Sequence, residues 1–209
     1  VLAELAGKSS DAALTASLLQ DAAVVAEQGG AIDDSAAALK AALAQNPEHL
    51  EILAQLSDLY LRHKRFSDGE QVLRKRVSLV PEVEKVRIYL QLAEVDAELG
   101  RPLEAAGALT EAVKHGADEL KHLPRIVELL EAGGRPADVS EALLRWSTLE
   151  EKAGDAAKAS SLSVRRAKLL ETSLGDKAEA IRRYVEVLKK NASDPEAVAA
   201  LEGLLADEA

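Results

Sequence analysis

The sequence predicts an all-α protein made of antiparallel helix pairs, and three observations support that prediction. Hydrophobic residues make up 47% of the chain and aromatic residues only 2%, so Ala and Leu supply most of the predicted core. Such a core suits closely packed helices, because strands favour β-branched and aromatic residues. The other two observations are helix breaks marked by glycine and a spacing of about 34 residues between similar sites.

Helix breaks recur along the chain at glycine. Leu-rich segments end at Gly100-Arg101-Pro102, at Gly134-Arg135-Pro136 and at Gly175-Asp176. Glycine suits the left-handed conformation that follows a helix end, and proline suits the first turn of the next helix. Each break therefore predicts a turn between two helices.

Periodicity and breaks together predict eleven helices. Ser10 and Asp33 are predicted N-caps, since a short oxygen-bearing side chain accepts hydrogen bonds from first-turn amides. Pro124 is predicted to open a helix at about Leu123, or to kink one. The predicted helices span residues 11–28, 33–45, 48–63, 67–79, 82–99, 103–115, 120–132, 137–153, 156–174, 177–190 and 195–206.

Two residue types keep a constant relation within the predicted second helices. A small or β-branched residue recurs at spacings of 34, 36, 34 and 41 residues, and a large one follows it four residues later. A small residue lets two helices approach, and the large one fills the space beside it. The small or β-branched residues are Ser35, Gly69, Ala105, Val139 and Ala180. The large residues are Leu39, Leu73, Leu109, Leu143 and Tyr184.

This spacing resembles that of the tetratricopeptide repeat family, whose unit is a helix–turn–helix of about 34 residues. Residues 46–81 match best, because Leu53, Leu56 and Tyr60 fall on one face of the first helix. The resemblance extends from about Asp11 to the end of the chain, with divergent fourth and fifth units. It implies a right-handed solenoid of antiparallel helix pairs.

The organisation implied by the resemblance is a single repeat domain over residues 1–209, with about five helix pairs and a terminal helix. The chain starts at Val1 and contains no methionine, which predicts a fragment of a longer or processed protein. The last helix, Asp194–Ala206, is predicted to lack a partner in this chain. We therefore expect either a window cut from a longer array or a terminal helix that caps it.

Composition and charge argue against several classes of function. The formal net charge is −10 and no basic stripe is present, so a nucleic acid backbone would be repelled. No run of eighteen apolar residues occurs, so insertion into a membrane is not expected. The chain has no cysteine, which excludes disulfides, thiolate metal sites and cysteine nucleophiles. The compartment stays open, with the cytoplasm favoured over the periplasm.

Motifs for catalysis, cofactors or metals do not assemble in the sequence. Gly7-Lys8-Ser9 is similar to the end of a P-loop, but the required earlier glycine and strand are absent. No two histidines have the i, i+4 spacing of a helical metal site. We therefore expect no enzyme activity, no cofactor and no metal, with a helical enzyme domain as a remote alternative. The histidines are His49, His63, His115 and His122.

The resemblance implies that the chain is a protein–protein interaction scaffold. In tetratricopeptide domains the first helix of each pair lines a concave groove, which receives a peptide or a partner's helix. Trp146 lies on the second helix of the fourth unit, and its side chain is predicted to pack in the core or between repeats and not to form an exposed binding anchor. The family's groove positions correspond to Glu51, Asp58, Leu61 and Arg62 in the second unit, Arg87, Leu90, Glu94 and Glu98 in the third, and Lys121, Glu128 and Glu131 in the fourth.

The groove residues depart from one binding mode of the family. Asp58 and Glu94 stand where chaperone-binding members carry asparagine in a clamp for carboxylates. That manner of binding an acidic C-terminal peptide is therefore disfavoured, and the mixed charges favour a ligand with both signs or a solvated groove. The alternative is a structural spacer, or a module that self-associates through its end helices.

Overall fold

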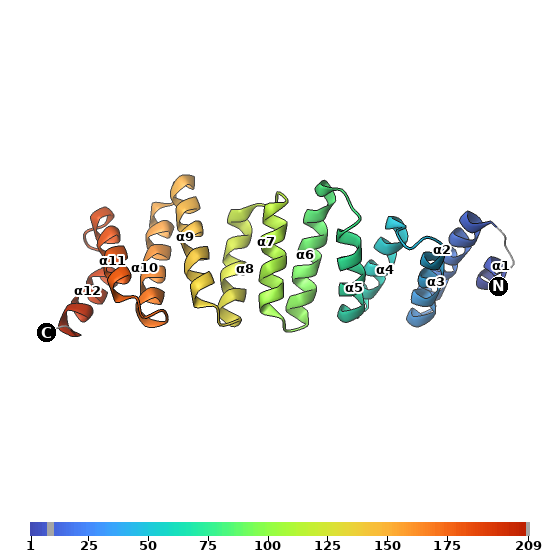
Figure 1. Ribbon diagram of the computed structural model, residues 1–209, viewed down its shortest axis with the longest axis horizontal. Helices are drawn as coiled ribbons and strands as arrows, with labels where there is room; N and C mark the ends of the chain where they lie inside the picture. The colour runs from blue at the N-terminus through green and yellow to red at the C-terminus, as the bar shows by residue number, and fades with distance from the viewer. Residues whose placement is uncertain (8–10, 208–209) are drawn as a thin grey trace. The chain divides into compact units, whose positions relative to one another are not determined.

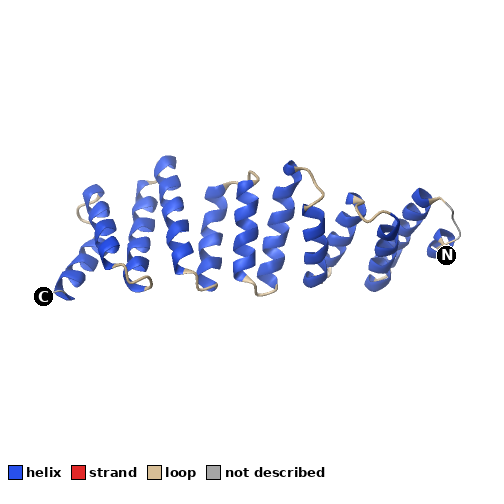
Figure 2. Ribbon diagram, in the orientation of Figure 1, coloured by secondary structure: helices blue, strands red, loops and turns tan. Residues whose placement is uncertain are grey.

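The computed structural model describes residues 1–7 and 11–207, and all regular structure in these residues is α-helical (Figure 1, Figure 2). The eleven predicted helices are present, with ends within two residues of the predicted ones, and a short helix precedes them. Within the described residues no helix is both long enough and apolar enough to cross a membrane. The helices are α1 (Leu2–Ala6), α2 (Ala12–Gln28), α3 (Ile32–Gln45), α4 (Leu50–Arg62), α5 (Phe66–Val77), α6 (Glu82–Glu98), α7 (Pro102–Lys114), α8 (Glu119–Ala132), α9 (Pro136–Ala153), α10 (Ala156–Thr172), α11 (Lys177–Lys190) and α12 (Pro195–Asp207).

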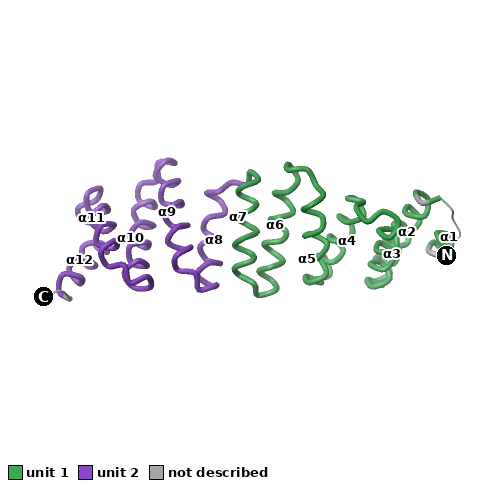
Figure 3. Tube along the Cα trace, in the orientation of Figure 1, with its two compact units in different colours: residues 1–116 green, residues 117–209 purple. Residues whose placement is uncertain are grey.

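The chain divides into two compact units, residues 1–116 and residues 117–209 (Figure 3). Helices α1 to α7 belong to unit 1, and helices α8 to α12 belong to unit 2. Within each unit, every helix packs against the next one along the chain. Each unit is therefore an all-α helical repeat, and the single repeat domain over residues 1–209 stays a prediction.

Close packing of the pairs depends on the small residue near the start of each second helix. All five small or β-branched residues predicted for this role are buried, and so is the large side chain one turn later in every case. At Gly69 of α5 an added Cβ would lie 3.2 Å from Leu61 Cδ2 and 3.5 Å from Tyr60 Cβ, both on α4. The predicted relation between small and large residues is therefore confirmed.

Apolar clusters join successive helices within each unit. In unit 1 one cluster extends from α1 to α4 and includes Leu39, Ile52 and Tyr60. In unit 2 one cluster joins α8, α9 and α10, and a second joins α10, α11 and α12. Ala197 and Leu204 of α12 are buried in the second cluster. Helix α12 has no second helix to pair with among the described residues, as predicted, but it buries an apolar stripe against the preceding helices.

Trp146 lies in the core of unit 2, as predicted. Its side chain is 8% exposed, and its Nε1 donates a hydrogen bond to Glu150 Oε1 at 2.8 Å. Lys158 Nζ pairs with the same carboxylate at 2.6 Å and lies 5.2 Å from the centre of the indole ring. These two donors lower the pKa of Glu150, Lys158 first and Trp146 second, so a carboxylate is held ionised beside the ring.

The turns after α2, α4, α6 and α8 share one backbone arrangement. Gly100 has a φ of 70°, and its N–H donates to Ala97 O at 3.0 Å, while the next N–H donates to Asp96 O at 2.9 Å. Lys64 takes the same place after α4, with a φ of 56° and an N–H bond to Leu61 O at 3.1 Å. A side chain at positive φ is strained, so Lys64 is a costly residue at this turn.

The predicted caps at the start of α2 and α3 have different outcomes. Ser10 lies outside the described residues, and Asp11 caps α2 by accepting hydrogen bonds from the N–H groups of Ala13 and Leu14. Asp33 is not the cap of α3, because that helix already begins at Ile32. It lies in the first turn, where a carboxylate is favoured by the helix dipole and where it pairs with Arg65.

The first of the two alternatives predicted for Pro124, that it opens a helix near Leu123, is wrong. Helix α8 begins earlier, at Glu119, where Asp118 caps it by accepting a hydrogen bond from the Lys121 N–H. Pro124 therefore lies inside the helix, at a cost of one backbone hydrogen bond. The burial of Leu123 and Val127, at 2% and 0% exposure, offsets that cost and keeps the helix in place.

A network of charges connects α5, α6 and the start of α7. Asp96 of α6 is 1% exposed, and its Oδ2 accepts a hydrogen bond from Arg74 Nη2 at 3.4 Å. The shorter bonds go to Glu70, from Arg74 Nε and Arg101 Nη1, both at 2.8 Å. Burial raises the pKa of Asp96 against the opposing charge of Arg74. Burial also acts to raise the pKa of Glu70, but its two arginine partners lower it overall.

Replacing Lys64 by glycine should stabilise the protein. Lys64→Gly removes the strain of a side chain at a φ of 56° and should raise the free energy of unfolding by about 1 kcal/mol, net of the greater freedom of glycine in the unfolded chain. Gly100→Ala introduces the same strain at the equivalent turn and should lower it by a similar amount. Urea denaturation followed by circular dichroism measures both changes, and a Lys64→Gly protein less stable than wild type would contradict the interpretation.

Replacing Asp96 by asparagine should change the pH dependence of stability. The folded pKa of Asp96 lies above the ordinary value of 3.8, so the folded state binds the proton more tightly than the unfolded state does. Its contribution to stability is therefore present below 3.8 and is lost as the pH rises through the folded pKa. Asp96→Asn, which resembles the protonated form, should match wild type in acid and become more stable than wild type near neutral pH.

The measurement is a series of urea denaturation curves for wild type and Asp96→Asn, from pH values below 3.8 to neutral pH. Arg74 and Arg101 keep Glu70 as a partner in the variant, so the comparison isolates Asp96. A stability difference that does not change with pH would contradict the raised pKa.

Candidate functional site

The first helices of unit 1 carry the surface that the sequence points to. We call the side chains of α2, α4 and α6 that are exposed or half-buried the first-helix surface of unit 1. Two contacts hold α2 beside α4. Gln20 Nε2 donates to Gln55 Oε1 at 3.1 Å, and Arg62 Nη2 donates to both oxygens of Glu27, at 2.8 and 2.9 Å.

A shallow pocket of about 160 Å³ opens between α2 and α4 on this surface. Gln20, Val24 and Glu27 line it from α2, and Asp58 and Arg62 line it from α4. Val24 is 50% exposed and adds an apolar patch to the wall. The structure therefore places Asp58 and Arg62, two of the predicted groove residues, in one pocket.

The charges in this pocket are unequally compensated. Burial acts to raise the pKa of Glu27, but hydrogen bonds from Arg62 and His63 lower it overall, so the pair of Glu27 and Arg62 is ionised and mutually neutralised. Asp58 is half-buried and forms no ion pair with any described residue. An uncompensated carboxylate beside a neutral pair and an apolar side chain can accept a basic group from a ligand.

The other predicted residues of α4 and α6 are spread along the helices. On α4, Glu51 is exposed, while half-buried Leu61 packs against Gly69 of the neighbouring second helix. On α6 three charged side chains are exposed and one leucine is half-buried. None of the three charged side chains belongs to an ion pair among the described residues, so these charges remain available to a ligand. These four are Arg87, Leu90, Glu94 and Glu98.

The predicted residues of the fourth unit lie on α8, in unit 2. Lys121 is exposed. Glu128 accepts a hydrogen bond from Arg125 Nη1 at 2.9 Å, and Glu131 pairs with Arg165 Nη2 of α10 at 2.5 Å. Both carboxylates therefore already have a cationic partner within unit 2, in contrast to Asp58.

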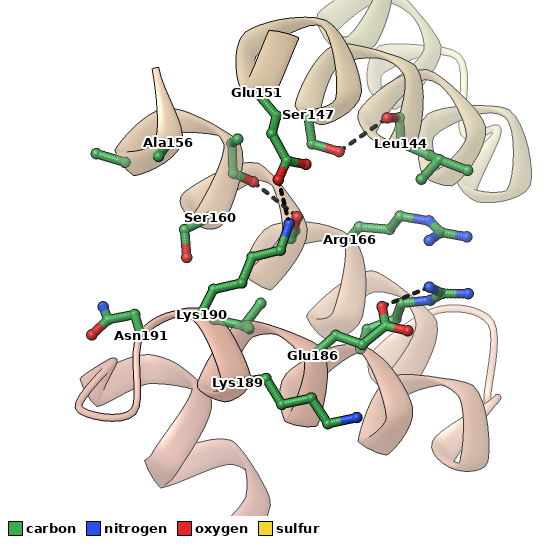
Figure 4. A pocket seen from close by; sticks show the side chains of 15 residues that line it. Leu144, Ser147, Glu151, Ala156, Ser160, Arg166, Glu186, Lys189, Lys190 and Asn191 are labelled. Carbon is green, nitrogen blue, oxygen red and sulfur yellow. Dashed lines mark hydrogen bonds and ion pairs between the residues drawn. The ribbon is translucent and has the colours of Figure 1, made fainter. Parts of the chain in front are cut away.

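Sequence reasoning missed a larger pocket in unit 2, of about 590 Å³, which is lined by α9, α10 and α11 (Figure 4). The sign in the sequence was the 41-residue spacing between Val139 and Ala180, which exceeds that of the other units. The longer spacing indicates longer helices and a divergence from the repeat. It does not show that a pocket is left between α9, α10 and α11.

The histidines and carboxylates do not gather into a metal site in the part of the chain that the structure describes. His63 Nε2 lies 3.1 Å from Glu27 Oε1, and His115 Nδ1 lies 2.6 Å from Glu82 Oε2. The His115 ring also stacks on Tyr89, with 5.3 Å between ring centres. These contacts account for both rings as links between helices of unit 1.

Comparisons with known proteins agree with this architecture. Residues 26–82 match the tetratricopeptide repeat family, and no curated protein sequence matches the chain. The crystal structure of MamA is 18% identical, with a TM-score of 0.50, over 85% of this chain and 92% of that one. The structure of Naa15/Naa10 bound to HypK is 19% identical, with a TM-score of 0.52, over 96% of this chain and 33% of that one.

A third similar structure is that of YrrB, described as a TPR protein with an unusual peptide-binding site. It is 11% identical, with a TM-score of 0.49, over 97% of this chain and 98% of that one. The likeness to MamA and to Naa15/Naa10 concerns the fold alone, whereas the family match concerns the sequence of residues 26–82. That match places residues 26–82 in the tetratricopeptide repeat family, and the helix pairs of both units show an all-α helical repeat fold.

Proposed function

We propose that the chain is a non-catalytic scaffold that binds a peptide or a helix of a partner protein on the first-helix surface of unit 1. The observation that carries this proposal is the pocket between α2 and α4, which holds Asp58 and Arg62 together. Repeat proteins of this fold generally act as scaffolds for other proteins, and the Naa15/Naa10 structure is by its title that of an assembly with HypK.

The charges of the surface favour a partner segment with basic residues. Glu51, Asp58, Glu94 and Glu98 are exposed or half-buried and form no ion pair among the described residues, whereas Arg87 is the one predicted cation on this surface that is similarly uncompensated. Arg62 is already neutralised by Glu27. Four carboxylates against one arginine give a local excess of negative charge, which attracts Lys and Arg and accelerates their association at low salt.

Apolar side chains on the same surface supply the other part of the recognition. Val24 is 50% exposed beside the pocket, and Leu90 is half-buried on α6. A partner helix with an apolar stripe flanked by basic residues would cover both kinds of side chain at once, as in binding of an amphipathic helix in a groove. Burial of the apolar stripe would supply most of the affinity, and the charges would fix its orientation.

The test is affinity capture of partners from the native lysate, with wild type beside the double variant Asp58→Lys/Glu94→Lys. Reversing two uncompensated carboxylates replaces attraction by repulsion and should weaken capture at least tenfold, as judged by quantitative mass spectrometry. Captured segments should be enriched in Lys and Arg after crosslinking to α4 or α6.

The matched control is Glu141→Lys/Glu202→Lys, which makes the same change of charge at exposed residues of α9 and α12. The control should capture the same proteins as wild type. If both double variants lose the same proteins, or neither loses any, binding depends on net charge or on another surface and the proposal is wrong. Circular dichroism establishes that all three proteins are folded.

A further inference from the structure

The pocket on α9, α10 and α11 has a floor of small side chains and a charged wall (Figure 4). Ala156, Ala159, Ser160 and Ser163 of α10 line the floor. Because these side chains are short, they leave a volume of about 590 Å³ between the second helices α9 and α11. That volume falls within the range of pockets that bind ligands.

The carboxylates that line this pocket are already paired. Lys190 Nζ reaches across from α11 to Glu151 Oε1 of α9 at 2.6 Å, and Arg183 Nη1 donates to Glu186 Oε2 at 2.8 Å. Figure 4 shows the first of these pairs crossing between the two helices. The negative groups of the pocket are therefore neutralised by two of its four cations.

The remaining cations, Arg166 and Lys189, have no acidic partner among the described residues. Arg166 is half-buried, and its Nε donates a hydrogen bond to the neutral Ser140 Oγ at 3.1 Å. The lining thus has four cations and two carboxylates, a local excess of positive charge in a chain with a net charge of −10.

The surroundings of Arg166 disfavour its charge as the pocket stands. Burial lowers the pKa of Arg166 first and repulsion from Arg183 lowers it further, while attraction from Glu179 and Glu186 opposes part of this shift. A guanidinium remains protonated at any physiological pH, so Arg166 is a half-buried cation without a direct acidic partner, because Glu179 and Glu186 pair with Arg183. Ser160 Oγ is also buried in the same pocket without a hydrogen-bond partner. Both groups would be satisfied by a ligand that brings an anionic acceptor.

We propose that this pocket is a second docking site, which binds an acidic peptide segment of a partner protein. A Glu or Asp carboxylate of the segment pairs with the Arg166 guanidinium, which can donate two parallel hydrogen bonds to it. Lys189 attracts a further carboxylate, and small side chains of the segment lie on the Ala and Ser floor. The chain has a net charge of −10, so its surface outside the pocket repels a continuous phosphate backbone, whereas a short acidic segment can be confined to the pocket.

This site is distinct from the first-helix surface of unit 1 in both position and sign of charge. The pocket lies on the side of α10 that faces the second helices α9 and α11, and two consecutive arginines of α10 show this. Arg165 pairs with Glu131 of the first helix α8, whereas Arg166 bonds to Ser140 of the second helix α9. Arg165 and Arg166 therefore form a natural matched pair for mutation, with the same charge and the same helix but different surroundings.

The test is fluorescence anisotropy of a labelled ten-residue peptide of alternating Glu and Ala, titrated with the full chain. The reference peptide has Gln in place of Glu. The acidic peptide should bind and the reference peptide should not. Arg166→Gln should weaken binding about tenfold or more, because one charge-assisted pair is lost. Arg165→Gln should leave the affinity within about twofold, since its side chain belongs to another contact.

A second variant tests the pocket itself rather than its charge. Ser160→Leu places a larger side chain on the floor while all four cations are kept, and should abolish binding of the acidic peptide by filling the space. The emission of Trp146 reports whether unit 2 remains folded in each variant. The Asp58→Lys/Glu94→Lys protein should bind the acidic peptide as wild type does, which separates this site from the proposed function of unit 1.

Three results would overturn the proposal. Wild type could fail to bind the acidic peptide while folded. Arg165→Gln and Arg166→Gln could weaken binding equally, which would indicate attraction by net charge alone. Inorganic phosphate could displace the peptide at equal concentration, which would indicate a site for simple anions instead of a peptide segment.

Discussion

The close contact between the two helices of a pair is the constraint on which the rest of the structure depends. It is set at one point near the start of each second helix, where the side chain is small enough for the backbones to approach. At Gly69 even a methyl group would lie 3.2 Å from Leu61. One turn later a buried leucine or tyrosine fills the space that opens as the helices diverge. Because interiors are densely packed, this combination fixes the distance between the helices and the rotation of each about its axis.

That rotation determines which side chains remain for binding. On α4, the side chains that face the neighbouring helices are buried in the core, as Ile52, Leu56 and Tyr60 are. What is left is a stripe in which polar groups meet those of α2, as Gln55 and Arg62 do. The Gln20–Gln55 contact is part-buried, whereas the Glu27–Arg62 ion pair is exposed and contributes little to stability. Their main effect is to decide which charges are neutralised and which, like that of Asp58, remain open to a partner.

The parts of the fold that rest on local chemistry were predictable from sequence. Glycine at the helix ends, proline in the first turn and the relation between small and large residues all act within a few residues, and each was confirmed at its predicted place. The errors concern competition between local and distant effects. A carboxylate such as Asp33 serves equally well as a cap or in the first turn. Pro124 lies inside α8 because burial of the side chains around it outweighs one lost hydrogen bond.

The two surfaces proposed for binding were less predictable for the same reason. Family positions located the first-helix surface, but only the structure shows that Arg62 is neutralised by Glu27 while Asp58 is not. The pocket of unit 2 was not predicted at all, since its existence depends on three helices and on which of Arg165 and Arg166 faces α9. Adjacent residues of a helix point about 100° apart, so a sequence with two arginines in succession cannot tell which has a partner.

The difference in charge between the two surfaces bears on how such a scaffold selects partners. The chain as a whole is acidic, so long-range attraction brings basic segments toward it and disfavours acidic ones. An acidic segment must therefore be bound through short-range compensation, by groups that are already desolvated and lack a partner. Arg166 is half-buried without an acidic partner, and Ser160 Oγ is buried without a hydrogen-bond partner, whereas two exposed arginines of unit 2, Arg165 and Arg145, already face carboxylates. Selection of a partner at the pocket of unit 2 would consequently depend on contacts with individual groups. Selection at the first-helix surface of unit 1 would depend on the electrostatic field of many charges together.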